Sequence, residues 1–268
     1  MSITRGLEPR STRPPSVVFA DDGAPAADAA WSWIAGHDWQ GWRLEIVTVH
    51  ETLPPGDAPI RAARHVERVA PAEMRFVSCD HVDPRGDPRV VLLGYHGASL
   101  VVVGSHHRGH LAGLWAGSTT EWLIVGTPFP LLVARHGHRT RSVAICVDGS
   151  IHAHRAMEAY LSLPWSAQVT AHVLTVDDGT VDVEQALARA TAAFAGRPVP
   201  PVTRLVGAAK RVIPDYVRDN QVDLVVLGTR GLTGLKRMAV GSTVSALLKD
   251  DAANLLIAHV VDDGTEGA

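Results

Sequence analysis

Residues 142–149 read SVAICVDG, and residues 16–23 read SVVFADDG. A second pair of similar stretches follows them, LVVVGS at 100–105 and LVVLGT at 224–229. The shifts between the copies nearly agree, because Asp22 precedes Asp148 by 126 residues and Gly104 precedes Gly228 by 124. A constant order at a nearly constant shift indicates a duplicated domain, and the period is too long for a solenoid.

Each copy alternates short β-branched runs with longer Ala-rich segments of helical period, the pattern of a parallel sheet in an α/β fold. In the second copy we predict strands at 143–147, 169–176, 202–205, 224–227 and 254–260, and helices at 151–163, 183–195, 208–220 and 242–248. In the first copy we predict strands at 17–20, 44–49, 75–78, 100–103 and 131–134, and a weaker helix at 58–69. Nearly continuous apolar strands imply burial on both faces. The fold class is therefore α/β, with two tandem doubly wound parallel five-stranded sheet domains.

The repeat also predicts the domain limits. A polar tail covers 1–15, the first domain 16–135 and the second domain 142–262. The connecting segment 135–141, RHGHRTR, is short enough that the halves should pack together, and we interpret its charge as that of a solvated connector.

Composition excludes several classes of function. A net charge of −3 and a pI near 6.5 give no basic excess for neutralising many phosphates, so we expect no nucleic-acid partner. Cys79 and Cys146 lack metal-ligand spacing and fit a reduced compartment as buried apolar side chains. No secretory signal and no apolar run of membrane-spanning length is present. We predict a cytoplasmic protein without a membrane partner.

Residues that suit an anion follow two strands of the second copy. Asp148-Gly149-Ser150 comes after the first strand, and a G-x2-G-x9-G-[ST] segment begins at Gly228. Ligands of open parallel sheets bind beyond the carboxyl ends of the strands. Glycines allow close backbone approach, and a helix start supplies unpaired N–H groups, so the pattern favours phosphate binding.

The duplicated opening and the glycine segment resemble the universal stress protein family in its tandem, two-domain form, over nearly the whole chain. The resemblance implies a Rossmann-like fold of the adenine nucleotide alpha hydrolase type and ATP as the cofactor, with or without Mg²⁺. It implies that the strand ends contact adenine and ribose and that the glycine segment contacts the phosphates. Carried over by position, the implied nucleotide-binding residues are Asp148, Gly149, Ser150, Val176, Gly228, Arg230, Gly231, Gly241, Ser242 and Thr243.

The first copy departs from this pattern. Its matching residues are Asp22, Gly23, Gly104, Gly117 and Ser118. However, His107 replaces the second glycine, and Ala24 stands where the second copy has Ser150. A histidine adds bulk and disfavours positive φ, so we expect this site to be weaker or empty. Trp115 is a hypothetical plug of the defunct pocket.

We therefore predict an ATP-binding stress-response or regulatory protein that holds nucleotide mainly in its second domain. Two alternatives are a slow metal-dependent ATPase or phosphotransferase and a nucleotide-free dimeric scaffold. No P-loop, GxGxxG after a first strand, or GxSxG elbow occurs, so we assign no catalytic residue and expect at most weak ATP hydrolysis. We also assign no metal site, because His106, His107 and His110 lack nearby Cys or carboxylate ligands.

Three further expectations concern packing. The apolar stretch 254–260 is an edge strand able to pair the two copies, which predicts an intrachain pseudo-dimer or a homodimer. The tryptophans are expected to pack in the core or an interface, because they do not alternate with basic residues. His152 and His154 are expected to be exposed helix residues.

Overall fold

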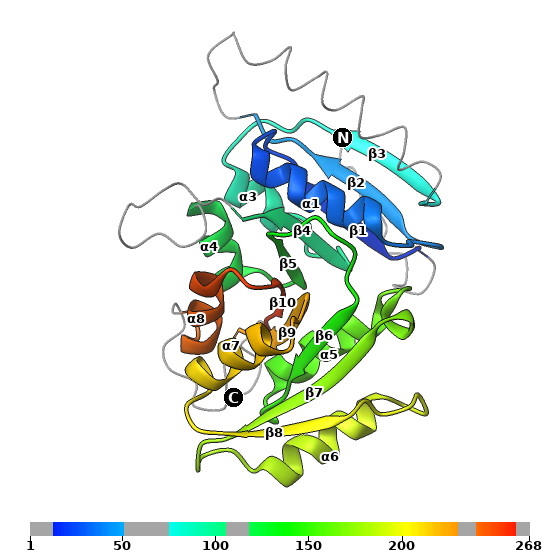
Figure 1. The fold of residues 1–268 in the computed structure, drawn as a ribbon. Helices are drawn as coiled ribbons and strands as arrows, with labels where there is room; N and C mark the ends of the chain where they lie inside the picture. Colours follow the sequence, from blue (N-terminus) through cyan, green and yellow to red (C-terminus); the bar gives the residue numbers. More distant parts are fainter. Residues whose placement is uncertain (1–12, 51–74, 106–117, 230–239, 261–268) are drawn as a thin grey trace, which may run out of the picture.

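The computed structural model describes residues 13–50, 75–105, 118–229 and 240–260 (Figure 1). The helix predicted at 58–69, Trp115 and the histidines between 106 and 110 lie outside these ranges. None of the helices in the described ranges is long and apolar enough to cross a membrane.

The first half of the chain contributes five strands and three described helices. Its elements are β1 (Ser16–Ala20), α1 (Pro25–Gly36), β2 (Arg43–Val47), β3 (Ser78–Val82), α3 (Pro88–Leu93), β4 (Leu100–Gly104), α4 (Ser118–Gly126) and β5 (Leu131–Ala134). Four of the five strands lie where alternation and apolar runs predicted them, within about two residues, the uncertainty expected of element ends. The exception is β3.

The second half follows its predicted pattern throughout. Its elements are β6 (Ser142–Cys146), α5 (Ile151–Ser162), a 3₁₀ turn (Ser166–Gln168), β7 (Thr170–Asp177), α6 (Val183–Ala193), β8 (Val202–Val206), α7 (Ala209–Asp219), β9 (Leu224–Gly228), α8 (Ser242–Asp250) and β10 (Asn254–Ala258). Local signals explain this success: Ser150 and Asp182 cap α5 and α6 by accepting backbone N–H bonds.

The two halves form one continuous sheet of ten strands in the order β3-β2-β1-β4-β5-β10-β9-β6-β7-β8. Within each half all neighbouring strands are parallel. The halves join where β10 pairs antiparallel with β5, Leu256 opposite Leu132 (Figure 1). The intrachain pairing predicted for the last strand is therefore confirmed. Because the join is antiparallel, the carboxyl ends of the strands face opposite edges of the sheet in the two halves.

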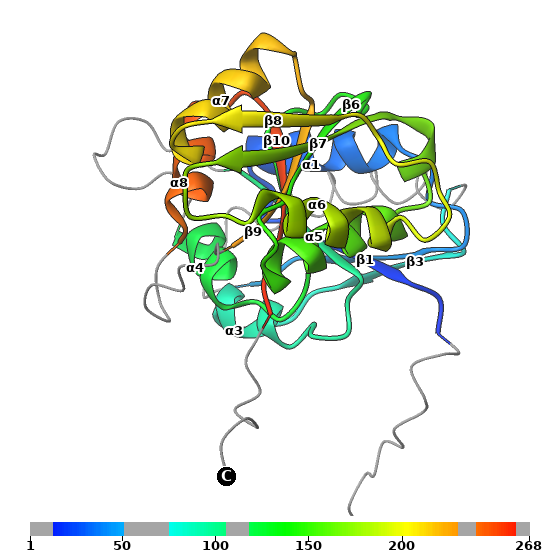
Figure 2. The same ribbon diagram turned by 90° about the horizontal axis from the view of Figure 1, so that it is seen from below.

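Helices cover both faces of the sheet, and alternate residues of each strand contribute to two cores. In β9, Leu224 and Val226 belong to the core under α1, α5 and α6, whereas Val225 and Leu227 belong to the core under α3, α4, α7 and α8. Figure 2 shows these last four helices together along one side of the molecule. The doubly wound parallel architecture is thus confirmed in both halves.

The prediction for β3 is wrong by three to four residues. Residues 75–77 form a turn, in which Phe76 is buried against Trp39 with ring centroids 5.6 Å apart, whereas Val77 is 60% exposed. The strand itself, SCDHV, is half polar because β3 is the outermost strand of its half and no described strand pairs with its far side. The apolar residues at 75–78 therefore indicated the buried Phe76, not the strand that begins at Ser78.

The connecting segment is solvated only in part: His138, Arg139 and Arg141 are exposed, but Arg135 is not, which corrects the interpretation for that residue. The Arg135 side chain is 1% exposed, and its guanidinium donates to the carbonyl oxygens of Leu247 and Leu248 at the end of α8, at 2.9 and 2.5 Å. Burial lowers its pKa, and Asp251 and Asp250 partly oppose this shift. A cation at a helix C-terminus satisfies unpaired carbonyls and complements the helix dipole.

An aromatic cluster adds a second contact between the halves. Trp165 of the second half is fully buried and lies 5.7 Å from Trp33 and 6.4 Å from Trp39, both of the first half, between ring centroids. The expected packing role of the tryptophans is confirmed for these three residues. Trp122 on α4 remains 37% exposed.

Candidate functional site

The turn between β6 and α5 holds three of the predicted residues in one local structure. The Asp148 carboxylate accepts the Ser150 N–H at 2.9 Å, and Gly149 adopts a φ of +79°, which favours glycine. The Ser150 hydroxyl then accepts the Ala153 N–H at 3.2 Å and caps α5. The turn therefore fixes Asp148 at the carboxyl end of β6.

The first half repeats this turn without the cap. Asp22 accepts the Ala24 N–H at 2.9 Å, and Gly23 has a φ of +71°. Ala24 has no side chain able to accept a hydrogen bond, so α1 begins without a side-chain cap. The departure seen in the sequence at Ala24 thus has a local structural consequence.

Gly228 has a packing role that sequence reasoning missed. A Cβ atom at this position would lie 2.6 Å from the Ala153 nitrogen, closer than real Cβ contacts, so the absent side chain lets α5 lie directly on β9. Gly104 does the same in the first half, where a Cβ would lie 2.4 Å from the Ala26 oxygen. These glycines are explained by helix–strand contact, and the phosphate role of Gly228 stays a prediction.

The end of the glycine segment returns to the strand from which it started. The Gly241 N–H donates to the Thr229 carbonyl oxygen at 3.1 Å, and α8 begins at Ser242. The Gly241 carbonyl accepts the first helical bond, from Ser245. The start of α8 therefore lies at the carboxyl end of β9, with Ser242 and Thr243 in its first turn.

The sheet topology brings these parts to one edge. β6 and β9 are neighbours, but α5 covers one face and α8 the other, so the chain leaves the two strands in opposite directions. A crevice opens at such a switch point in open α/β sheets. Val176, buried at the end of β7, lies at the same edge beside β6.

Some predicted residues are not described. Arg230 and Gly231 lie outside the described ranges, as do His107 and Gly117 of the first half. Ser118 begins α4, as the pattern predicted for a helix start.

A histidine pair lies beside the glycine segment and was not predicted. The rings of His152 and His259 stack with centroids 5.0 Å apart and planes 2° apart. His152 Nδ1 accepts the Val260 N–H at 3.0 Å, and His259 Nδ1 lies 3.0 Å from the Thr229 hydroxyl. Both histidines lie on α5 as expected, and the His154 side chain is 37% exposed, whereas His152 is half-buried, so the expectation of exposure is wrong for His152. Only the tertiary structure brings positions 152 and 259 together.

Cys146, just before Asp148, is no nucleophile. Burial raises the pKa of its thiol to about 12, and the Asp148 charge adds to the rise, so the thiol stays protonated. Within the described ranges, no three His, Cys, Asp or Glu side chains gather as ligands for a metal ion.

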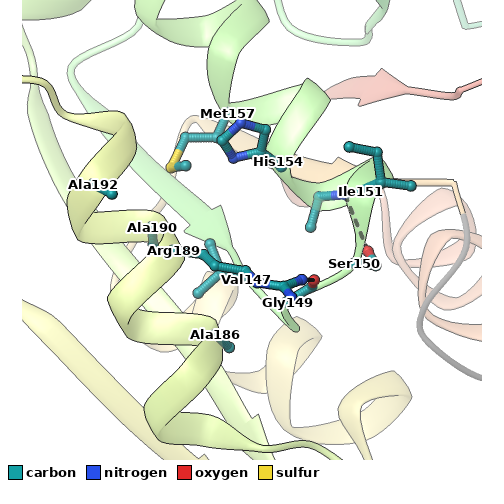
Figure 3. Close-up of a pocket in the computed structure, with 11 residues that line it drawn as sticks. Val147, Gly149, Ser150, Ile151, His154, Met157, Ala186, Arg189, Ala190 and Ala192 are labelled. Carbon is teal, nitrogen blue, oxygen red and sulfur yellow. Dashed lines mark hydrogen bonds between the residues drawn. The ribbon is translucent and has the colours of Figure 1, made fainter.

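A cavity of about 350 Å³ lies between α5 and α6 (Figure 3). Of the predicted site residues, only Gly149 and Ser150 line it. Val176, Gly228 and the start of α8 do not, so the cavity shares only the turn after β6 with the predicted nucleotide site.

Comparisons with known proteins agree with the sequence pattern. The model of the universal stress protein family matches residues 15–135 and 177–259. A universal stress protein of Synechocystis is 28% identical over 180 residues. The match covers 65% of this chain, and the chain spans 59% of the length of that relative.

Solved structures share the fold over nearly the whole chain. A universal stress protein from Archaeoglobus fulgidus covers 91% of this chain and 97% of its own, with a TM-score of 0.72 and 15% identity. A functionally unknown protein from Pseudomonas aeruginosa covers 91% and 92%, with a TM-score of 0.64 and 17% identity. At such identities the likeness concerns the fold alone.

Proposed function

The chain belongs to the universal stress protein family, and on this premise we propose that it is a regulatory protein of the stress response that binds an adenine nucleotide. The nucleotide is ATP, with or without Mg²⁺, and it binds at the carboxyl edge of the second half. Nucleotide occupancy then alters the shape or the partner choice of the protein.

One observation carries the proposal: the Asp148 turn and the start of α8 lie at the same edge, on two neighbouring strands whose helices diverge. The unpaired N–H groups at the start of α8 suit phosphate oxygens, and the hydroxyls of Ser242 and Thr243 can add hydrogen bonds. Asp148 and Val176 are assigned to the ribose and adenine end. Arg230 and Gly231 belong to the same segment and are assigned to the phosphates.

The first half is proposed to bind nucleotide weakly or not at all. It keeps Asp22, Gly23, Gly104, Gly117 and Ser118, but Ala24 leaves α1 without a side-chain cap. His107 adds a side chain where the second half has Gly231. The two edges face opposite directions, so a nucleotide at one edge makes no contact with the other.

The nucleotide released from purified, denatured protein tests both parts of this proposal. Chromatography and mass spectrometry should find about one ATP per chain if only the second half binds. About two per chain would refute the assignment of a weak first half. No released nucleotide, together with no calorimetric binding of ATP and Mg²⁺, would refute the proposed function.

A pair of variants locates the site. Ser242→Ala combined with Thr243→Ala removes two hydroxyls from the start of α8 and should weaken ATP binding about tenfold, the usual effect of losing a hydrogen bond to a charged group. Ser245→Ala removes a hydroxyl one turn later on the same helix and should leave the affinity unchanged. Equal affinities for all three proteins would place the nucleotide elsewhere.

Two alternative functions have their own signatures. A slow ATPase or phosphotransferase would show metal-dependent turnover faster than about one per minute, still far below usual enzyme rates. A nucleotide-free scaffold would keep its assembly state whether or not ATP is present.

Three other expectations also stay predictions: the cytoplasmic location, the domain limits 16–135 and 142–262, and a homodimer.

A further inference from the structure

We propose that the cavity between α5 and α6 is a second binding site, for a small molecule with an apolar body and one anionic group. The anionic group is a carboxylate, a sulfonate or a phosphate. This inference does not rest on nucleotide binding, because only Gly149 and Ser150 belong both to the cavity and to the predicted nucleotide site.

The walls of the cavity are apolar. Val147 closes it at the sheet, Met157 faces it from α5, and Ala186 and Ala190 face it from α6 (Figure 3). The cavity opens towards solvent, and short alanine side chains form part of its α6 wall. A volume of about 350 Å³ falls within the range of small-molecule sites.

Two of the polar side chains that line the cavity are an arginine and a histidine. Arg189 reaches from α6 and donates to the Gly149 carbonyl oxygen at 2.6 Å, which uses one of the five N–H donors of a guanidinium (Figure 3). His154 lies on α5 at the same cavity. No Asp or Glu is among the described lining residues. Glu158, 3.4 Å from His154, is not a lining residue and also lies 3.5 Å from Arg155, so Arg189 is the charged side chain that lines the cavity.

Two residues that line the cavity differ at the matching positions of the first half, where only the counterpart of α5 is described. Helix α1 corresponds to α5 residue by residue at a shift of 126. At this shift Trp31 stands in the place of Met157, and Asp28 stands in the place of His154. Trp31 packs against Phe19 with ring centroids 5.8 Å apart. In the described part of the first half, the helix therefore carries a larger side chain in place of Met157 and an acid in place of His154.

The experiment uses the full chain, freed of small molecules, and the probe 8-anilino-1-naphthalenesulfonate, which has apolar rings and one sulfonate. Fluorescence titration should show one saturable site per chain, with no displacement by ATP. Decanoate should compete with the probe, and decanol, the uncharged analogue, should compete at least tenfold less well because it cannot pair with Arg189.

Variants that copy the first half identify the site. Met157→Trp fills the cavity with the residue of the matching position and should abolish probe binding. Arg189→Gln should weaken it about tenfold. Arg197→Gln removes a neighbouring exposed cation, which donates to Leu161, and should change nothing. Circular dichroism melting checks that each variant is folded.

Probe binding unchanged in folded Met157→Trp, or unchanged in Arg189→Gln, would overturn the proposal. Displacement of the probe by ATP would also overturn it, because the probe would then report the nucleotide crevice. If Met157→Trp fails to fold, Arg189→Gln and the comparison of decanoate with decanol decide the question.

Discussion

His37 is a fully buried histidine at the junction of the two halves, and its hydrogen bonds fix its protonation state. Its Nε2 accepts the Thr140 N–H at 3.1 Å, so Nδ1 carries the proton and donates to the Trp33 carbonyl oxygen at 2.6 Å. The rings of Trp33 and Trp165 lie 4.4 and 4.3 Å away. A second proton would disrupt the bond to the connecting segment.

This environment predicts a pH-dependent stability. Burial lowers the pKa of His37 from 6.5 to about 4, and nearby Arg139 and Arg75 oppose protonation further. As the pH falls, His37 therefore takes up a proton in the unfolded chain at a higher pH than in the folded chain. The unfolding free energy that is present above pH 6.5 is lost as the pH falls towards 4. The loss amounts to about 3 kcal/mol for this residue.

Urea unfolding between pH 7.5 and 4.5 measures this effect. The difference in unfolding free energy between the wild type and His37→Gln should shrink as the pH falls, and His96→Gln, at an exposed position, serves as the control. A difference that stays constant over this range would contradict the assignment.

At Gly228 we predict that a single methyl group destabilises the protein. Gly228→Ala places Cβ against the backbone of His152 and Ala153, so α5 must shift away from β9, at a cost of about 2 kcal/mol. Gly97→Ala is the matched control, because a Cβ there meets no atom within 4 Å. Thermal unfolding of both variants gives the comparison, and equal stabilities would mean that the close contact is absent.

At the scale of elements, β10 holds the halves together through its side chains as well as its backbone. Asn254, at its start, is fully buried, and its oxygen accepts the N–H groups of Arg135 and His136 at 2.7 and 2.9 Å. Its amide group donates to the His136 carbonyl oxygen at 3.0 Å. The Asn254 side chain therefore makes three hydrogen bonds to the backbone of the connecting segment, as a neighbouring strand would.

Replacing Asn254 should be costly. Asn254→Ala leaves buried donors and an acceptor without partners, and we expect a loss of about 3 kcal/mol in unfolding free energy. Asn220→Ala also removes an asparagine-to-backbone bond, but at an exposed position, and should cost much less. Chemical denaturation of both variants tests the expectation. Similar losses would show that burial at the join does not matter.

Elements with strong local signals were predictable, and one element without them was not. Helices α5 and α6 begin where the helical period predicted them, and Ser150 and Asp182 cap them with hydrogen bonds that depend only on residues within a single turn. β3 was misplaced because an outermost strand needs no continuous apolar run. In the candidate site, the turn at Asp148 was predictable for the same local reason, whereas the stacking of His152 on His259 was not.

At the scale of the whole molecule, the shared core predicts one cooperative unfolding transition. The core that includes Trp33 and Trp39 also includes Trp165, Tyr160 and strands of both halves. Urea titrations followed by tryptophan fluorescence and by far-UV circular dichroism should therefore have the same midpoint. Trp165→Ala should lower the unfolding free energy by about 3 to 5 kcal/mol. Both midpoints should therefore move to lower urea concentration together. Two separate transitions would indicate independently stable halves.

The same architecture limits how two chains can associate. β5 and β10 pair with each other inside one chain, so a homodimer has to use another surface, such as the outermost strands β3 and β8. Light scattering coupled to size-exclusion chromatography measures the mass of the protein in solution and so tells a monomer from a dimer.

The sequence by itself determined the duplication, the parallel α/β architecture, most element positions and the turn at Asp148. These properties depend on repeats, periodicity and caps, which act over a few residues or recur at a fixed shift. The tertiary structure alone decided the burial of His37 and Arg135, the hydrogen bonds of Asn254 to the connecting segment and the cavity between α5 and α6. Each of these depends on groups far apart in the chain, whose contact is set by how the helices and strands pack.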